Sequence, residues 1–398
     1  GWLKQEALDD FLTQGKKTAS WHSLAAYKAK LLWDMSHDPD LTIPWEPFRA
    51  FCEKNAYWLD DYALFRAVRD FFGGRCWTEW PEDIRHHSQA ALSQYGKELA
   101  GAVSHVKFMQ YIFSRQWHDV RAYAAENGVS ILGDVPMFVA HNSADCWAHQ
   151  DQFDLDEAGN PSSVAGVPPD YFSADGQLWG NPLYDYQTMA KDNYQWWTDR
   201  FRRMMDLVDE VRVDHFRGFA AYWAVPAGSE TAKNGAWKEG PGLDLFRAVY
   251  QKIGRLCLVA EDLGVITDDV CTLKDALHLP GMKVIQFHLK DRADGRLAFD
   301  TEPDCIAYTG THDNNTIRGW YEDDLTPSQQ LHVRQMLGLS DEAAPQEIVG
   351  ALIAYTYRRR AETVIIPMQD LLALPSSGRM NTPGVADGNW HWQLKEGQ

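Results

Sequence analysis

The chain has 398 residues, of which 45% are hydrophobic and 24% charged, so it can bury a large core as one big barrel or as two domains. Its formal net charge of -18 and the lack of a long Lys/Arg run argue against a nucleic-acid partner, because the phosphate backbone would be repelled. The six cysteines include no C-x-x-C pair and no stretch of about 18 uncharged apolar residues occurs, which predicts a reducing, cytoplasmic location and no membrane span.

The first part of the chain predicts helices. Up to about residue 106, apolar residues recur at spacings of three and four, as in WLKQEALDDFL from Trp2, SLAAYKAKLLWDM from Ser23 and DDYALFRAVRDFF from Asp60. A further amphipathic stretch begins at Lys107 and ends on Asn127-Gly128, as is typical of a helix end. We therefore expect a helical subdomain of residues 1–106, inserted in a barrel whose remaining part is formed by residues 107–398.

After this helix, short apolar runs alternate with helical segments. The six runs, each bounded by polar residues, are 129–135, 210–216, 255–262, 283–289, 306–313 and 363–369. This alternation indicates parallel strands buried on both faces, in an open doubly wound sheet or a closed barrel. Polar residues at the C-terminal ends of several runs favour the barrel, which places catalysis there, whereas an open sheet would gather them near one switch point. We predict an α/β fold, a (β/α)8 TIM barrel with helical insertions whose first two strands are absent from this chain.

The run EVRVDHF supplies the first candidate acid. Because side chains alternate along a strand, Arg212 and Asp214 share one face, while Val211 and Val213 share the other. We predict that the charged pair points inward and that the valines pack against helices. The neighbouring guanidinium would keep Asp214 ionised and able to act as a nucleophile. A purely structural ion pair would give the same sequence, and for this run alone it is the favoured interpretation.

Two later runs supply the other candidate acids. In LVAEDLG, apolar residues run directly into Glu261. If Glu261 shares a cavity with an ionised Asp214, charge repulsion and partial desolvation would raise its pKa toward that of a general acid and base. In TGTHDNNT, His312 and Asp313 follow a short strand, which alone is an unspecific pattern. Three carboxylates at three strand ends are more specific together. Glycosidic bond cleavage needs two of them, about 5 to 5.5 Å apart in a retaining enzyme, and a third could bind sugar hydroxyls.

The motifs around these acids resemble glycoside hydrolase family 77, the amylomaltases or 4-alpha-glucanotransferases, related to the alpha-amylase barrels. The similar segments include ILGDVPMFVAHNSADCW, VAGVPPDYFSADGQLWGNPLYDY, VRVDHFRGFAAYWAVP, LVAEDLGVITDDV, PGMKVIQFH, YTGTHDNNTIRGW, GRMNTPG and NWHW. The resemblance implies transfer of an alpha-1,4-glucan segment to a new 4-hydroxyl by a retaining double displacement, in maltooligosaccharide, glycogen or starch metabolism. It implies no cofactor, and alpha-1,4-glucans and maltooligosaccharides as binding partners.

The resemblance also implies roles for single residues. Asp214 would be the nucleophile, Glu261 the general acid and base, and Asp313 the transition-state stabiliser. The substrate contacts would come from Arg212, His312, Asp134, Asn142, Trp179 and Asn181. At Asn142 the family pattern has an Asp, and the change keeps an acceptor but removes a charge. Aromatic residues in loops that follow strands are candidates for stacking on sugar rings, namely Tyr171, Phe172, Trp179, Tyr184, Trp237 and Trp320. No His or Cys spacing predicts a metal site.

Alternatives remain open at this stage. The family begins with two barrel strands and a substrate-contacting S-P-Y segment, and neither is found in this sequence. We expect a fragment whose N-terminal segment was cleaved, lost or placed in another chain, and the alternative is a natural protein that is itself shortened. An alpha-amylase-type glucan hydrolase and an inactive glucan-binding fragment are the competing functions.

Overall fold

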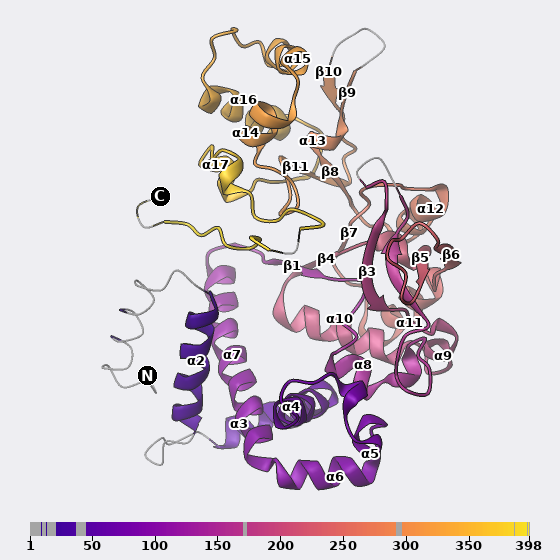
Figure 1. Ribbon diagram of the computed structural model, residues 1–398. Helices are drawn as coiled ribbons and strands as arrows, with labels where there is room; N and C mark the ends of the chain where they lie inside the picture. Colours follow the sequence, from indigo (N-terminus) through magenta and orange to yellow (C-terminus); the bar gives the residue numbers. More distant parts are fainter. Residues whose placement is uncertain are drawn as a thin grey trace.

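A computed structural model describes residues 9, 13, 21–36, 45–169, 173–291, 297–385, 387–395 and 397 (Figure 1). The candidate stacking residues Tyr171 and Phe172 lie outside the described residues, as does most of the helix predicted from Trp2.

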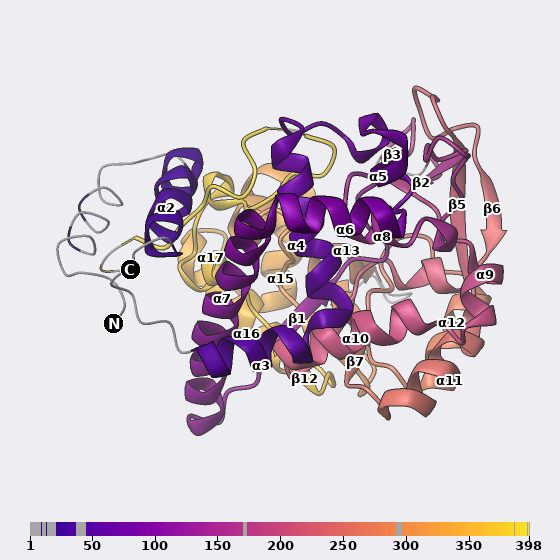
Figure 2. The ribbon, with the colours of Figure 1, turned by 90° about the horizontal axis from the view of Figure 1, so that it is seen from below.

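The N-terminal region is helical, as predicted. Its helices are α2 (Trp21–Ser36), α3 (Trp45–Lys54), α4 (Ala56–Phe71), α5 (Glu82–Arg85), α6 (Gln89–Glu98) and α7 (Ala100–Glu126). Figure 2 shows α3, α4, α6 and α7 across the face that is seen from below. Buried side chains of α4, among them Phe65 and Val68, join the main hydrophobic core. Helix α7 passes through residue 106 without a break, so the domain division at that residue stays a prediction. None of the described helices has the length and apolar character needed to cross a membrane.

All six predicted parallel strands occur. They are β1 (Leu132–Val135), β4 (Glu210–Val213), β7 (Leu258–Ala260), β8 (Gly281–Val284), β11 (Cys305–Tyr308) and β12 (Thr363–Ile365). They form two parallel three-stranded sheets, in the orders β1-β4-β7 and β8-β11-β12. The prediction of a strand over 283–289 is wrong in its second half, where Ile285–His288 form helix α13. The His288 ring turns back there, with Nδ1 2.9 Å from the Val284 carbonyl oxygen, so the chain leaves the sheet.

A few polar bonds join the two sheets. The Ala260 N–H donates to the Pro280 carbonyl at 2.9 Å, so β7 lies beside β8. The Asp262 carboxylate accepts from the Met282 N–H and from Lys274 Nζ, both at 2.7 Å. The strands thus follow one another in the order β1-β4-β7-β8-β11-β12. Among the described residues, the outer edges of β1 and β12 pair with no further strand, so these residues form an open array and not a closed eight-stranded barrel.

The array has one face toward helices and one toward a cavity. As predicted, Val211 and Val213 are buried in the main core, where they join Phe201 of α10 and Phe246 of α11. Arg212 lies on the opposite face, where its Nε is 3.4 Å from the Met282 sulfur.

The remaining α-helices of the described residues are α8 (Ala144–Ala148), α9 (Tyr186–Lys191), α10 (Gln195–Leu207), α11 (Gly242–Ile253), α12 (Asp268–Leu277), α14 (Ile317–Gly319), α15 (Pro327–Leu337), α16 (Pro345–Tyr357) and α17 (Met368–Leu371).

Six further strands are antiparallel and were not predicted. The strands β2 (Ser163–Val167), β3 (Gln177–Pro182), β5 (Ala221–Pro226) and β6 (Ala236–Glu239) form a sheet in the order β3-β2-β5-β6. The strands β9 (Leu289–Asp291) and β10 (Leu297–Phe299) form a separate antiparallel pair. Figure 1 shows β3, β5 and β6 to the right of β4, and β5 follows β4 closely along the chain.

Candidate active site

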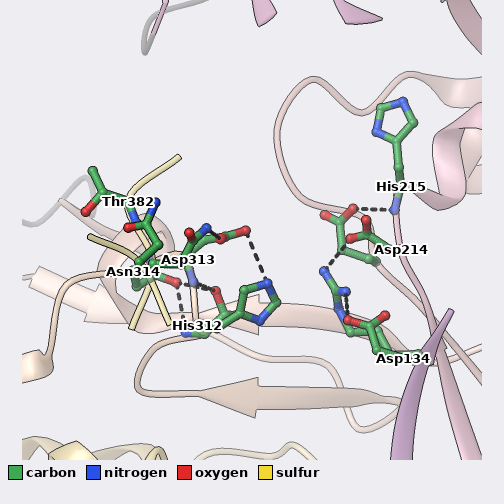
Figure 3. A network of polar contacts seen from close by, with 12 residues as sticks. Asp134, Asp214, His215, His312, Asp313, Asn314 and Thr382 are labelled. Atoms are coloured by element: carbon green, nitrogen blue, oxygen red, sulfur yellow. Dashed lines mark hydrogen bonds and ion pairs between the residues drawn. The ribbon is translucent and has the colours of Figure 1, made fainter. Parts of the chain in front are cut away.

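Arg212 holds two carboxylates from neighbouring strands. Its Nη2 lies 2.8 Å from Asp214 Oδ1 and its Nη1 lies 2.6 Å from Asp134 Oδ2 (Figure 3). The Arg212 side chain is only 12% exposed. Burial alone would lower the pKa of this guanidinium, but the carboxylates of Asp214, Asp134 and Glu261 outweigh burial and raise the pKa. A permanently charged cation therefore sits between the ends of β1 and β4.

Glu261 lies directly after β7 and has a different environment. Its Oε2 accepts from the His215 N–H at 2.9 Å, and its Oε1 accepts from the Leu263 N–H at 2.8 Å. Burial raises the pKa of Glu261 to about 7; the Asp214 charge adds to the rise, and Arg212 opposes it. The predicted rise is therefore confirmed, with burial as its main cause. A carboxyl group with this pKa can both donate and accept a proton near neutral pH.

The third candidate, Asp313, lies in the loop after β11. Its Oδ2 is 3.5 Å from His312 Nε2, and its Oδ1 accepts from Asn381 Nδ2 at 2.6 Å. Arg379 donates to the Asp313 carbonyl at 2.6 Å, and the Asn381 N–H donates to the His312 carbonyl at 3.0 Å. The C-terminal segment thus fastens the His312-Asp313 pair from outside the strand array.

A cavity of about 360 Å³ lies next to these groups, although Asp214, Glu261 and Asp313 are not themselves part of its lining. Its lining includes Asp134, Arg212 and His312, together with Met282 of β8 and Tyr308 of β11. This volume lies in the range of about 300–1,000 Å³ that is common for small-molecule sites. In Figure 3 Asp134 and Asp214 lie on the right of the view and Asp313 lies on the left. The His312 ring extends from the Asp313 side toward the other two acids. The fold therefore gathers residues from both three-stranded sheets around one space.

Three predicted substrate residues are not part of this cavity lining. Trp179 is 38% exposed, and its ring lies 4.8 Å from the ring of His215, the residue after Asp214. Asn181 donates through Nδ2 to the Val139 carbonyl at 2.8 Å. The Asn142 Oδ1 is buried and has no hydrogen-bond partner among the described residues. Trp179 thus lies next to the Asp214 side of the site, and the binding roles of all three residues stay predictions.

The other candidate stacking residues differ in exposure. Tyr184 and Trp320 are buried, so the expectation that they present a ring face to sugar is wrong. Tyr184 packs among other aromatic rings, and its hydroxyl donates to the Met137 carbonyl. Trp237 is partly exposed on β6, with the Arg217 guanidinium 4.1 Å from its ring centre.

Residues near the C-terminus belong to the site but had been given no role from the sequence. Besides Arg379 and Asn381, the Trp390 ring lies 5.3 Å from the His312 ring. All three lie in GRMNTPG or NWHW, so the motifs pointed to this segment without indicating which residues contact the His312-Asp313 loop. The Tyr308 hydroxyl is buried and has no hydrogen-bond partner in the part of the chain that the structure describes. It had no sequence signal beyond its strand position.

This arrangement suits cleavage at an acetal carbon. Asp214 beside a cation can attack, and Glu261 can protonate the leaving oxygen, which are the two functions that retaining glycoside chemistry requires. In the described part of the chain, no cluster of three or more His, Cys, Asp or Glu side chains has the arrangement of a metal site.

Comparison with known proteins agrees with this chemistry. The profile of glycoside hydrolase family 77, described as 4-alpha-glucanotransferase, matches residues 1–397. A 4-alpha-glucanotransferase of Synechocystis sp. is 40% identical over 100% of this chain and 79% of its own length. A chloroplastic/amyloplastic 4-alpha-glucanotransferase of Arabidopsis thaliana is 42% identical over 92% of this chain, which spans 61% of that protein.

A solved structure is also similar. The amylomaltase from Streptococcus agalactiae, in complex with acarbose, has a TM-score of 0.88 and 32% sequence identity, over 95% of this chain and 76% of that one. The fold, the arrangement of the acids and the extent of these matches agree, and the chain belongs to glycoside hydrolase family 77, the 4-alpha-glucanotransferases.

Proposed function

We propose that this chain cleaves an alpha-1,4-glucan, retains the glycosyl part on Asp214 and transfers it to the 4-hydroxyl of a second glucan. The observation that carries the proposal is the contrast between two neighbouring carboxyl groups. Asp214 is bound to Arg212, whereas burial brings the pKa of Glu261 to about 7. Acarbose in the Streptococcus agalactiae structure supports a glucan-like ligand.

In the first step, an Asp214 oxygen attacks the anomeric carbon as the bond from this carbon to the glycosidic oxygen breaks. The Glu261 proton moves to that oxygen, so the leaving glucan departs with a free 4-hydroxyl. Asp214 becomes a glycosyl ester, and Glu261 becomes a carboxylate.

In the second step, the 4-hydroxyl oxygen of an acceptor attacks the same carbon, and the ester bond to Asp214 breaks. Glu261 now takes the hydroxyl proton, which restores both groups to their starting states. Two inversions at one carbon give net retention, and the new bond is again alpha-1,4.

The remaining polar residues are proposed to bind and orient the sugar. Arg212 would orient Asp214 as the nucleophile, and Asp313 would stabilise positive charge at the anomeric carbon. His312 and Asp134 would bind hydroxyl groups, because both line the cavity. Asn142, Trp179 and Asn181 would contribute farther along the glucan, where the ring of Trp179 offers a partly exposed stacking surface.

The open strand array suggests a completed barrel. We propose that two further parallel strands pair with the edges of β1 and β12, from a preceding segment or from a separate chain, and that residues 1–106 are a helical subdomain inserted in this barrel. Unpaired strand edges are prone to association, and the chain spans only 79% of its Synechocystis relative, which supports this view.

The six free cysteines support a reducing compartment such as the cytoplasm.

Product analysis on maltotriose tests the proposal. A 4-alpha-glucanotransferase gives glucose together with a ladder of longer maltooligosaccharides. Shorter products alone would identify a hydrolase, and unchanged maltotriose would leave only binding. Either of these two results would overturn the proposed transfer.

A further inference from the structure

Two side chains, one in the cavity wall and one outside its lining, hold both ends of the loop that carries His312 and Asp313. The first is Asp370 of α17, a residue that is only 1% exposed. Its Oδ2 accepts from the Thr309 hydroxyl at 2.6 Å, and its Oδ1 accepts from the Ile317 N–H at 2.7 Å. Thr309 directly follows β11 and Ile317 begins α14, so one carboxylate links the two ends of the loop.

The second side chain is Gln286 of α13. Its Nε2 donates to the carbonyls of Thr309 and Asn315, both at 3.0 Å. A Cβ added at Gly310 would come within 3.0 Å of this nitrogen, so the amide packs closely against the loop backbone. Gln286 therefore links nearly the same two points as Asp370, from a different element.

Neither side chain has a contact with Asp313 among the interactions described above. Asp370 forms part of the cavity wall, but each of its oxygens already accepts a hydrogen bond from the loop ends. Between those ends, Asn314 Oδ1 accepts from the Thr311 N–H and hydroxyl, which makes a tight internal turn. With the ends and the turn fixed, the direction in which Asp313 leaves the backbone is fixed as well.

We propose that Asp370 and Gln286 are positioning residues that hold Asp313 in its catalytic geometry. This inference rests on the proposed role of Asp313. Misplacement of a catalytic group by about 1 Å can cost about 10²-fold in rate, so loss of either clamp residue should act on the chemical step more than on substrate binding.

The chain offers a matched control for Gln286. Gln150 is also partly buried, and its Nε2 likewise donates to two backbone carbonyls, those of Arg85 and Trp147, at 2.7 and 2.9 Å. Its bonds lie in the helical region and not in the Asp313 loop. Gln286→Met and Gln150→Met therefore each remove two hydrogen bonds from a side-chain amide to backbone carbonyls, and a general loss of packing would affect both variants alike.

Asp370 offers a conservative variant. In Asp370→Asn, the amide oxygen can still accept from the Ile317 N–H, and the amide nitrogen can donate to the Thr309 hydroxyl, which accepts as well as donates. Asp370→Ala loses both bonds. If Asp370 acts through its two hydrogen bonds, Asp370→Asn should keep the kcat that Asp370→Ala loses. If its charge is what matters, both variants should lose kcat.

The experiment measures kcat and KM on maltotriose, the melting temperature, and hydrogen–deuterium exchange of the peptide that covers residues 309–317. We expect Gln286→Met and Asp370→Ala to lower kcat by about ten-fold to 10²-fold with KM within about two-fold, and to speed exchange in this peptide. Gln150→Met should lower the melting temperature to a similar extent while it keeps kcat and the exchange of the loop. Asp370→Asn should keep kcat within about three-fold of the unaltered chain.

Equal kcat for the Gln286→Met and Gln150→Met variants would overturn the proposed positioning role. An Asp370→Asn variant that is no more active than Asp370→Ala would overturn it as well. Should Asp370→Ala not fold, Gln286→Met and Asp370→Asn still decide the question. If the unaltered chain converts no maltotriose, the proposed function fails, and unchanged exchange of the loop in Gln286→Met would separately refute the clamp.

Discussion

At the scale of single residues, the carboxyl groups of the site lie in different surroundings. Asp214 and Asp134 share the Arg212 guanidinium, yet burial raises the pKa of Asp134. Glu261 accepts two backbone N–H groups among the described residues, and burial raises its pKa to about 7. Opposite charge favours the ionised form of a carboxyl group, and burial favours the neutral form. The proposed division between a nucleophile and an acid therefore rests on the Arg212 contact of Asp214 and on the burial of Glu261.

The raised pKa of Glu261 predicts a pH dependence. Since Glu261 must be protonated for the first step, kcat/KM on maltotriose should fall as pH rises through about 7. The folded state also binds this proton more tightly than the unfolded chain, so the Glu261 contribution to stability is present at low pH and lost between about 4.5 and 7. Glu261→Gln should remove both effects, whereas Glu210→Gln at the start of β4 should keep them. An unchanged alkaline limb in the Glu261→Gln variant would contradict the assignment.

The nucleophile assignment predicts the effect of Asp214→Asn. The amide cannot form the glycosyl ester, so transfer on maltotriose should fall by at least about 10³-fold. Arg212 keeps its bond to Asp134 in this variant, so the fold should persist, which circular dichroism and the melting temperature would check. Asp244→Asn, on the exposed side of α11, should keep full activity. Full transfer activity in Asp214→Asn would mean that another group forms the intermediate.

At the scale of elements, the parallel strands could be predicted from their recurring apolar runs, whereas strands that are held only by pairing with a neighbouring strand could not. The six parallel strands are short apolar runs bounded by polar residues, and this pattern is visible without any structure. Burial of every residue holds for β7 and β11, whereas β1 and β12 contain exposed residues. The strands of the β3-β2-β5-β6 sheet could not be found in this way, because every residue of β6 is exposed and its pairing depends on β5. The turn of the chain into α13 depends on the contact of His288 with Val284, which lies within an otherwise strand-like run.

At the junction between the two sheets, Gly281 is expected to tolerate no larger side chain without a loss of stability. A Cβ at Gly281 would lie 2.3 Å from Asp262 Oδ2, and this carboxylate holds both Met282 and Lys274. Gly281→Ala should therefore lower the free energy of unfolding by about 1–3 kcal/mol, measured by denaturant titration. Gly350→Ala in α16 is the control, because a Cβ there meets nothing within 4 Å. The control should gain about 0.5–1 kcal/mol from better helix propensity. Equal effects of the two substitutions would rule out the steric argument.

At the scale of the whole molecule, the candidate site is assembled from segments far apart in sequence. The three acids could be predicted because each follows a strand, and strand ends are visible in the sequence. The groups that hold Asp313 could not be deduced in this way. Asn381 lies 68 residues from Asp313 along the chain, and Asp370 lies 61 residues from Thr309, so only the folded chain brings each pair together.

A site that bridges both sheets predicts that ligand binding stabilises the whole fold. The cavity lining joins β1 and β4 to β8, β11 and the C-terminal segment, so a glucan bound there would contact parts that separate on unfolding. In Asp214→Asn, which does not consume the ligand, maltotriose at about 100 times its Kd should raise the free energy of unfolding by about 2.7 kcal/mol. The measurement is the melting temperature as a function of maltotriose concentration, with trehalose at equal mass concentration as the control for general sugar effects. A specific site requires saturation with maltotriose alone, and equal shifts with both sugars would mean that the cavity does not recognise an alpha-1,4-linked chain.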